Sequence, residues 1–344
     1  MARLPFGRGR TLFKGWNPNL IYIVAVPLAV IAVVVVVYGL RPFGRNDDAN
    51  QVSGGIDALN SSAPVAPRLA AELKTEPNLT GVAPRLSTES DPKTAELIAE
   101  AMLLANTKPD SVIEARDKLN QVLPLCKGQQ QRVSVKEQIS KLADKWLFNR
   151  TVLPNDKLCV SYQVRRGEQL TGIGEQFKVP YEILMQINNI HRPEALQAGQ
   201  IIKVIHGPFH VKISRSAFKM DLYLQDTFVR SFPVGLGMPG RETPTGTWRV
   251  KPGGKLISPT WTDPDTKRTY RAKDPDYPLG SRWIALEGIE GEAKGRTGFA
   301  IHGTKEPEQI GAAGSRGCIR LDNGVAVLIY NLLVPIHSTV TVEE

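Results

Sequence analysis

The clearest pattern along the chain is an uninterrupted apolar run near its N-terminus. Leu20–Leu40 contains 21 residues without a charge. At about 1.5 Å rise per residue, a helix of this length spans the roughly 30 Å hydrocarbon core of a bilayer. The apolar part of a cleaved signal peptide is shorter, about 7–15 residues, and ends at a small-x-small site that is absent here. We therefore expect one uncleaved transmembrane helix over residues 20–40, with a buried core helix as the alternative.

Charges on either side of this run indicate its orientation. Residues 1–19 form a basic tail that carries Arg3, Arg8, Arg10 and Lys14. After the run, the basic residues are balanced by Asp47 and Asp48. Cytoplasmic flanks carry the excess of positive charge, so we expect a cytoplasmic N-terminus. The sequence thus predicts a single-pass protein of the cell membrane whose remaining part is extracytoplasmic, either periplasmic or wall-facing.

The next two segments differ in their periodicity. Residues 41–90 are rich in Pro, Ser, Ala, Asn and Gly without a sustained apolar period, which is typical of a flexible linker. Residues 91–152 carry apolar positions at helical spacing in three stretches, which begin near Pro92, near Asp110 and near Ser134. We expect a small helical module there, and the sequence does not indicate which protein it would bind.

Two further segments complete the pattern. Residues 159–206 predict a compact βααβ unit, with short strands at 162–164 and 200–204 around two helices. Residues 207–344 alternate apolar and polar positions in short runs that Gly and Pro turns separate, and only 323–333 has helical spacing. The predicted fold class is therefore multidomain: a transmembrane helix, a helical module, a βααβ module and a mostly-β C-terminal domain.

Composition and charge narrow the function. The 344 residues are 42% hydrophobic, which is enough for packed cores in more than one domain and excludes wholesale disorder. The net charge is +9, but four of these positive charges lie in the N-terminal tail, so nucleic-acid binding is not expected. Three cysteines are too few for a disulfide scaffold.

The βααβ segment resembles the LysM module over its whole length. LysM modules bind glycans that contain N-acetylglucosamine, such as peptidoglycan, so the resemblance implies wall binding, with Gly167, Glu168 and Asn188 as candidate glycan-binding residues. A module that only packs against its neighbours is the alternative. Gly174 departs from the pattern, because a better helix former is expected there. The matching positions are Val164, Gly167, Glu168, Leu170, Ile173, Phe177, Val179, Asn188, Leu196, Gly199 and Gln200.

The three cysteines divide into a pair and a single residue. Cys126 and Cys159 could form a disulfide in an oxidising extracytoplasmic setting. Cys318 lies among small residues and two arginines, in Gly314–Leu321, which suits a nucleophile better than the alternative of a buried small apolar side chain. A thiol needs a base near neutral pH, and His302, 16 residues earlier at the end of an apolar strand, is the candidate.

These two segments resemble the L,D-transpeptidase catalytic domain, also called the YkuD domain. The family pattern is a His-Gly strand end followed by Ser-(His/Arg)-Gly-Cys-(Ile/Val)-Arg, and Ile301–Thr304 and Ser315–Arg320 match it. Arg316 stands where many relatives have His. The resemblance covers nearly all of 208–344, through the further segments Leu222–Leu224, Pro233–Gly237, Thr243–Gly246, Pro259–Trp261, Pro278–Gly280 and Asn323.

The chemistry of acyl transfer suggests a role for each site residue. We expect Cys318 to be the nucleophile, His302 its base, and the Gly303 carbonyl the group that orients the imidazole. The backbone N–H groups of Gly317 and Cys318 are expected to form an oxyanion hole. The candidate substrate-binding residues are Arg316, Arg320, Ser315 and Trp261, with a structural ion pair as the alternative for Arg320 and plain packing as the alternative for Trp261, Tyr270 and Trp283.

The resemblance implies a peptidoglycan L,D-transpeptidase that needs no metal and no organic cofactor. Cys318 would attack the third residue of a tetrapeptide stem, expel the terminal D-alanine and pass the acyl group to an amine of another stem. A loop over residues 261–280 is expected to roof the site. The alternatives are an L,D-carboxypeptidase, an enzyme that attaches proteins to the wall, and a non-enzymatic peptidoglycan-binding scaffold. The intact His302 and Cys318 argue against the scaffold.

Overall fold

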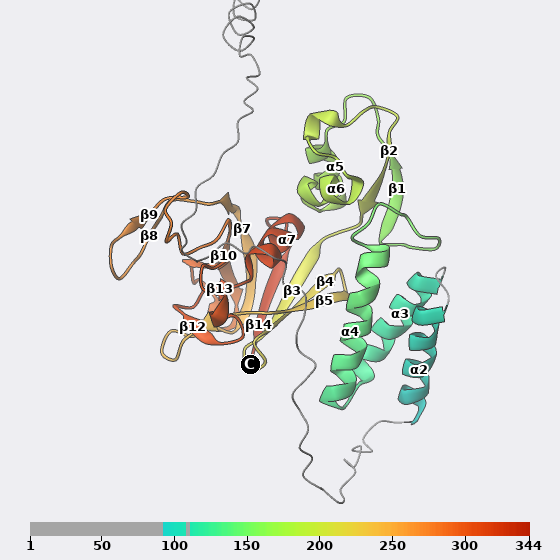
Figure 1. Cartoon of the computed structure of the whole chain (residues 1–344), viewed down its shortest axis with the longest axis horizontal. Coiled ribbons are helices and arrows are strands. Elements are labelled where there is room, and N and C mark those ends of the chain that lie inside the picture. Colours follow the sequence, from blue (N-terminus) through green and yellow to red (C-terminus); the bar gives the residue numbers. More distant parts are fainter. Residues whose placement is uncertain (1–91, 108–110) are drawn as a thin grey trace, which may run out of the picture. The chain divides into compact units, whose positions relative to one another are not determined.

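A computed structural model describes residues 92–107 and 111–344 of the chain (Figure 1). The predicted transmembrane run, the basic tail and the linker lie outside these residues. Within the described part, no helix is both long enough and apolar enough to cross a bilayer.

The described part begins with the predicted helical module. Its elements are α2 (Pro92–Thr107), α3 (Val112–Val122), the short 3₁₀ helix η3 (Leu123–Leu125) and α4 (Gln129–Trp146). The third helix begins at Gln129, earlier than the start expected near Ser134. Its first turn is polar and exposed, and its buried face starts only at Val135, so the apolar pattern did not reveal the first turn. The module's core consists of Ala101, Ala115, Leu119, Val135, Ile139, Leu142 and Trp146.

The βααβ unit is confirmed. Antiparallel strands β1 (Cys159–Gln163) and β2 (Ile201–Ile205) enclose α5 (Leu170–Phe177), α6 (Tyr181–Asn188) and the short η4 (Pro193–Ala195). Gly174, unexpected in a helix, has a steric reason. A Cβ at this position would lie 2.6 Å from the Val179 carbonyl oxygen, so glycine allows the turn between the two helices to fold against α5.

A buried lysine joins this unit to the helical module. Lys203 of β2 is 2% exposed, and its Nζ donates to the carbonyl of Trp146, the last residue of α4, and to the carbonyls of Asn149 and Thr151 in the segment that follows. Burial lowers the pKa of Lys203. At Trp146 the ammonium satisfies a carbonyl that the helix end leaves without a partner, and this position also favours a positive charge.

The C-terminal domain is mostly β, as predicted. Its main sheet has eight strands in the order β13-β11-β10-β7-β14-β3-β4-β5. Their bounds are β3 (Phe209–Ser214), β4 (Lys219–Leu224), β5 (Thr227–Pro233), β7 (Gly246–Ile257), β10 (Arg282–Glu290), β11 (Phe299–His302), β13 (Ile319–Arg320) and β14 (Thr339–Glu343).

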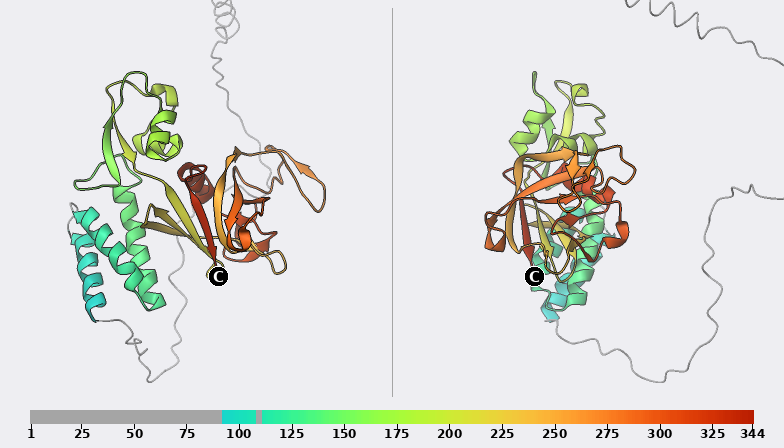
Figure 2. Two further views of the ribbon diagram at one scale, coloured as in Figure 1. Left: turned by 180° about the vertical axis from the view of Figure 1, so that it is seen from behind. Right: turned by 90° about the vertical axis from the view of Figure 1, so that its left-hand side faces the viewer.

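Smaller elements surround this sheet. The helix α7 (Asn323–Leu332) lies against the sheet, and the hairpin β8 (Trp261–Thr262) and β9 (Thr269–Tyr270) projects from it (Figure 2). A separate parallel pair joins β6 (Leu236–Gly237) to β12 (Ala313–Ser315). Two short 3₁₀ helices complete the domain, namely η5 (Gly291–Ala293) and η6 (Pro307–Gln309).

The edge strand β5 is covered by the helical module. The Asn120 side chain accepts from the Phe228 N–H at 2.7 Å and donates to the Phe228 carbonyl at 3.4 Å, which imitates a strand pairing. Arg230 on the same strand donates to the Ser140 carbonyl and pairs with Asp144. An exposed edge strand is a template for aggregation, so this cover protects the sheet.

The possible disulfide between Cys126 and Cys159 is not formed. Cys126 and Cys159 are both buried free thiols. Cys126 follows η3, where its Sγ bonds the Val122 carbonyl and Arg132 is the nearby charge. Cys159 starts β1, beside Lys203 and Asp156. The two thiols therefore lie in different surroundings, and sequence position alone could not show this.

The Lys203 contacts lead to a stability prediction. Replacing Lys203 with Met leaves three carbonyls without their donor, and each unsatisfied buried group costs about 1–3 kcal/mol, less where water reaches it. We expect Lys203→Met to lower the free energy of unfolding of this part by at least about 1 kcal/mol, measured by the urea midpoint. The matched control is Lys157→Met at an exposed lysine. Equal midpoints for the two variants would show that the ammonium contributes nothing.

Candidate active site

Parallel pairing of β11 with β13 brings the two reactive residues together. Ile301 lies opposite Ile319 and His302 opposite Arg320, so Cys318, directly before β13, lies level with Ala300, two residues before His302 on the neighbouring strand. His302 and Cys318 both line a cavity of about 420 Å³. The residues brought together are thus those that the sequence singled out.

The buried imidazole of His302 has one defined tautomer. Its Nδ1 lies 2.6 Å from the Gly303 carbonyl oxygen, which can only accept, so Nδ1 carries the hydrogen and Nε2 is left as the basic nitrogen. The Trp283 ring stacks on the imidazole at 5.4 Å between centroids and 16° between planes. Burial lowers the pKa of His302 to about 4, so the ring is neutral near pH 7.

Burial also keeps the nucleophile neutral. It raises the pKa of the Cys318 thiol, which outweighs the lowering by the Ala300 backbone N–H and by the charge of Arg320. The resting site therefore holds a neutral thiol and a neutral imidazole rather than an ion pair. Such a site must move the thiol proton during the reaction itself.

The loop before Cys318 is held from inside, which changes two expected roles. Ser315, expected to bind substrate, is buried, and its hydroxyl donates to the Cys318 carbonyl at 2.6 Å while it accepts from the Gly317 N–H at 3.1 Å. The Gly317 N–H is therefore engaged inside the loop rather than presented as an oxyanion donor. Ser315 lines the cavity, and its hydroxyl shapes the loop.

Glycine is required at position 317 for a conformational reason. Its φ is +109°, in the region that L side chains rarely adopt, and a Cβ there would lie 2.7 Å from Cε1 of Phe299. The Gly-Cys step is thus a sharp turn that lies against an aromatic ring. This turn presents Cys318 at the edge of the sheet.

Both candidate arginines line the cavity but are already paired. Arg316 donates to Asp263 at 2.9 Å and pairs with Asp265 at 2.8 Å. Arg320 pairs with Glu306 and donates to Gln309. The ion-pair alternative for Arg320 is therefore what the structure contains, and Arg316 has the same kind of role.

The pairing of Arg316 ties the β8–β9 hairpin to the nucleophile loop. Asp263 Oδ1 accepts from the N–H groups of Asp265 and Thr266, and its Oδ2 accepts from Arg316. The Thr266 N–H is the largest cause that lowers the pKa of Asp263, to about 2, with Arg316 adding to it. Trp261 stacks on Tyr270 in the same hairpin, and both line the cavity. Part of the segment expected to roof the site, Trp261 included, therefore belongs to the wall of the cavity.

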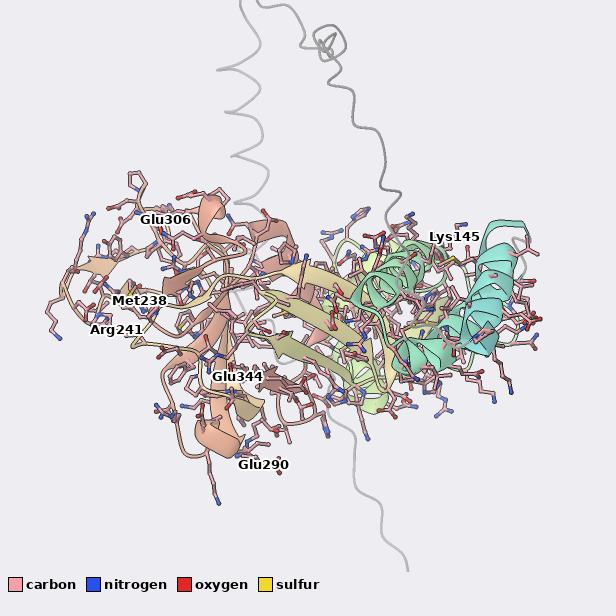
Figure 3. All side chains as sticks on the ribbon, turned by 90° about the horizontal axis from the view of Figure 1, so that it is seen from below. Lys145, Met238, Arg241, Glu290, Glu306 and Glu344 are labelled. Carbon is pink, nitrogen blue, oxygen red and sulfur yellow. The ribbon has the colours of Figure 1, made fainter. Side chains whose placement is uncertain are left out.

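Other loops complete the cavity. Met238 and Arg241, which follow β6, lie close together, toward the same end of the domain as Glu306 (Figure 3). Arg241 shares Asp265 with Arg316, at 2.9 Å. Sequence reasoning missed Asp263, Glu306 and Gln309, because acidic and amide side chains in turn-rich loops carry no signal of their own. Among the described residues, no three His, Cys, Asp or Glu side chains gather as metal ligands.

The candidate glycan-binding residues of the βααβ unit have internal partners. Asn188 is buried, donates to the carbonyls of Leu184 and Lys203, and accepts from the Lys203 N–H. It therefore joins α6 to β2 and is not available to a glycan. Glu168 accepts from the Tyr162 hydroxyl and the Arg165 N–H, which fixes the turn at Gly167, where φ is +86°.

Two family models match the chain. Residues 208–342 match the model described as the L,D-transpeptidase catalytic domain, and residues 162–204 match the LysM domain. The C-terminal domain is thus an L,D-transpeptidase catalytic domain preceded by a LysM domain. The chain is an L,D-transpeptidase.

Similar proteins carry the same name. The chain is 28% identical to "Putative L,D-transpeptidase YkuD" of Bacillus subtilis, over 54% of this chain and 99% of that protein. It is 30% identical to "Probable L,D-transpeptidase ErfK/SrfK" of Escherichia coli, over 44% of this chain but only 43% of that protein. An L,D-transpeptidase structure from Mycobacterium smegmatis has a TM-score of 0.30 and 19% identity, covering 42% of this chain and 64% of that one.

The lowered pKa of His302 predicts the pH at which the acylation rate falls on the acid side. For a free enzyme, kcat/KM falls where its essential base becomes protonated. We expect the rate of Cys318 acylation by a carbapenem, followed by absorbance, to hold as the pH falls to about 5 and to drop through about 4. A drop centred near the ordinary histidine value of 6.5 would contradict a buried neutral imidazole.

Proposed function

We propose that this L,D-transpeptidase cross-links peptidoglycan through an acyl-enzyme on Cys318, with His302 as the base. The observation that carries the proposal is that Cys318 and His302 line one cavity, with the imidazole tautomer set by Gly303. A thiol in the same cavity as an unprotonated Nε2 is suited to attack coupled with proton transfer. The LysM domain is proposed to hold the enzyme on glycan strands.

The reaction divides into two acyl transfers. In the first, Cys318 Sγ attacks the carbonyl of the third residue of a tetrapeptide stem as its proton passes to His302 Nε2. The oxyanion that forms is stabilised by the Cys318 N–H, and the terminal D-alanine leaves with the proton from His302. In the second, an amine of another stem attacks the thioester, His302 takes its proton, and the thiol is restored with that proton.

The β8–β9 hairpin favours an amine over water in the second step. It contributes Trp261 and Tyr270 to the cavity wall, where they can hold a bound acceptor near the thioester and limit the access of solvent. An L,D-carboxypeptidase would differ only in admitting water at this step. These aromatic side chains in the cavity wall are the reason that we favour transfer.

The location of the enzyme belongs to the same proposal. Leu20–Leu40 is proposed as a single membrane span with the basic tail in the cytoplasm and the LysM and catalytic domains outside. Peptidoglycan, the proposed substrate, lies on that outer side of the membrane.

Covalent labelling tests the nucleophile. We expect a carbapenem to add one adduct to the protein, seen by intact mass, and Cys318→Ala to abolish both the adduct and acyl transfer. Cys126→Ala is the matched control and keeps both, because the Cys126 thiol is buried outside the cavity that holds His302. Cys159 is also fully buried outside that cavity, and burial raises its pKa to about 12 without His302 to take its proton. A full adduct on Cys318→Ala would assign the nucleophile elsewhere.

The hairpin contact gives a second test, of the choice between amine and water. Asp263→Asn keeps an oxygen for the two backbone N–H groups but loses the charge that holds Arg316. The Asp263 carboxylate is mostly buried, but Arg316 reaches solvent. A surface ion pair of this kind contributes about 0.2–1 kcal/mol, so the tripeptide-to-dimer product ratio should rise by a factor of roughly 1.5–5.

The product ratio is measured by chromatography of muropeptides with acceptor stems in excess. Asp226→Asn, at an exposed aspartate away from the hairpin, is the control and should leave the ratio unchanged. If wild type yields only tripeptide under these conditions, the carboxypeptidase alternative replaces the transpeptidase. If Asp263→Asn gives the same product ratio as wild type, the ion pair does not control how the hairpin limits water at the thioester.

A further inference from the structure

The buried hydroxyl of Thr243 has contacts that the mechanism above does not use. Thr243 lies between β6 and β7 and is 2% exposed. Its Oγ1 donates to the Gly317 carbonyl at 2.9 Å and accepts from the Gly237 N–H at 3.1 Å. A threonine from a distant segment therefore binds the peptide group that immediately precedes the nucleophile.

The direction of the hydroxyl hydrogen follows from its two partners. The Gly237 N–H can only donate, and the Gly317 carbonyl can only accept. The hydroxyl hydrogen must therefore point at the Gly317 oxygen. The turn that carries Thr243 is tight, since a Cβ at Gly237 would lie 2.1 Å from the Arg241 carbonyl oxygen, so the hydroxyl has little freedom to move.

Fixing this carbonyl also fixes the N–H of the nucleophile. The Gly317 carbonyl and the Cys318 N–H belong to one planar trans peptide, in which the two bonds point in opposite directions. With the oxygen turned toward Thr243 in the interior, the N–H of Cys318 points the other way. A peptide next to glycine rotates easily, so the carbonyl needs an anchor to keep one orientation.

Ser315 holds the neighbouring groups of the same loop. Its hydroxyl binds the Gly317 N–H and the Cys318 carbonyl, on either side of the peptide that Thr243 holds. The two hydroxyls together engage the Gly317 N–H and both carbonyls of this Gly-Cys step. The Cys318 N–H is the group of the step that neither hydroxyl binds.

We propose that Thr243 is a positioning residue that aims the Cys318 N–H at the oxyanion formed during acylation. The inference rests on the proposed acyl-enzyme reaction and adds a residue to it. Without the hydroxyl, the peptide is free to turn, and the donor no longer meets the developing charge. Removing an oxyanion donor outright costs about 10²–10³ in rate, and misdirecting one costs less.

Two reactions of the same thiol separate this role from a structural one. A carbapenem acylates Cys318 through a tetrahedral oxyanion, whereas iodoacetamide alkylates it by displacing iodide at a saturated carbon and forms no oxyanion. We expect Thr243→Val to slow acylation about tenfold or more and to leave the alkylation rate within about twofold. Thr243→Ser, which keeps the hydroxyl, should restore acylation.

Matched variants keep the result interpretable. Thr245→Val removes a hydroxyl from the same segment, beside Glu292 and away from the nucleophile loop, and should change neither rate. If Thr243→Val fails to fold, judged by its thermal transition, Thr243→Ala carries the same test with a smaller side chain.

Two outcomes overturn the inference. A parallel loss of both rates means that the hydroxyl only maintains the fold around the thiol. Unchanged acylation means that the Cys318 N–H needs no such anchor. Failure of the proposed function gives a different result, because wild type itself would then show no acylation by the carbapenem.

Discussion

The pairing of β11 with β13 is the constraint on which the site depends. It places His302 and Arg320 side by side, and the Leu321 N–H closes it by donating to the His302 carbonyl at 2.9 Å. Cys318 directly precedes β13, so the register of two short strands determines where the thiol lies relative to the imidazole. A slip of β13 by one residue would turn the Cys318 side chain to the face of the sheet opposite His302.

Around this pairing, buried polar groups with defined partners hold the reacting residues in place. The Gly303 carbonyl selects the tautomer of His302, Trp283 holds the ring, and the hydroxyls of Ser315 and Thr243 hold the nucleophile loop. Buried polar groups are costly without partners, so such a network permits one arrangement. The same burial keeps both reacting groups neutral, and the charged groups lie at the rim, where Arg316 pairs with the hairpin.

Local sequence signals predicted much of this structure. The βααβ unit and the mostly-β domain followed from apolar periodicity, and His302, Gly303 and Cys318 followed from the motifs that contain them. The start of α4 was placed too late, because its first turn has no apolar face. These features depend on neighbours in sequence, which is why a pattern can reveal them.

The remaining features depend on partners that are distant in sequence. Arg316 and Asp263 are 53 residues apart, and Thr243 and Gly317 are 74 residues apart. No local pattern could show that Arg316 holds the hairpin or that Ser315 and Asn188 turn inward. For the same reason the sequence left open whether Cys126 and Cys159 pair, because cysteine spacing does not report where two thiols lie in space. In the structure both are free thiols.

The central claim is that the resting site holds a neutral His302 whose hydrogen lies on Nδ1. Nitrogen NMR of protein labelled with ¹⁵N in histidine tests this directly, with His302→Gln to assign the signal. At about pH 6, close to the ordinary histidine pKa, the account predicts a protonated Nδ1 and an unprotonated Nε2 for His302. Protonation of both nitrogens at that pH, or a hydrogen on Nε2 alone, would contradict it.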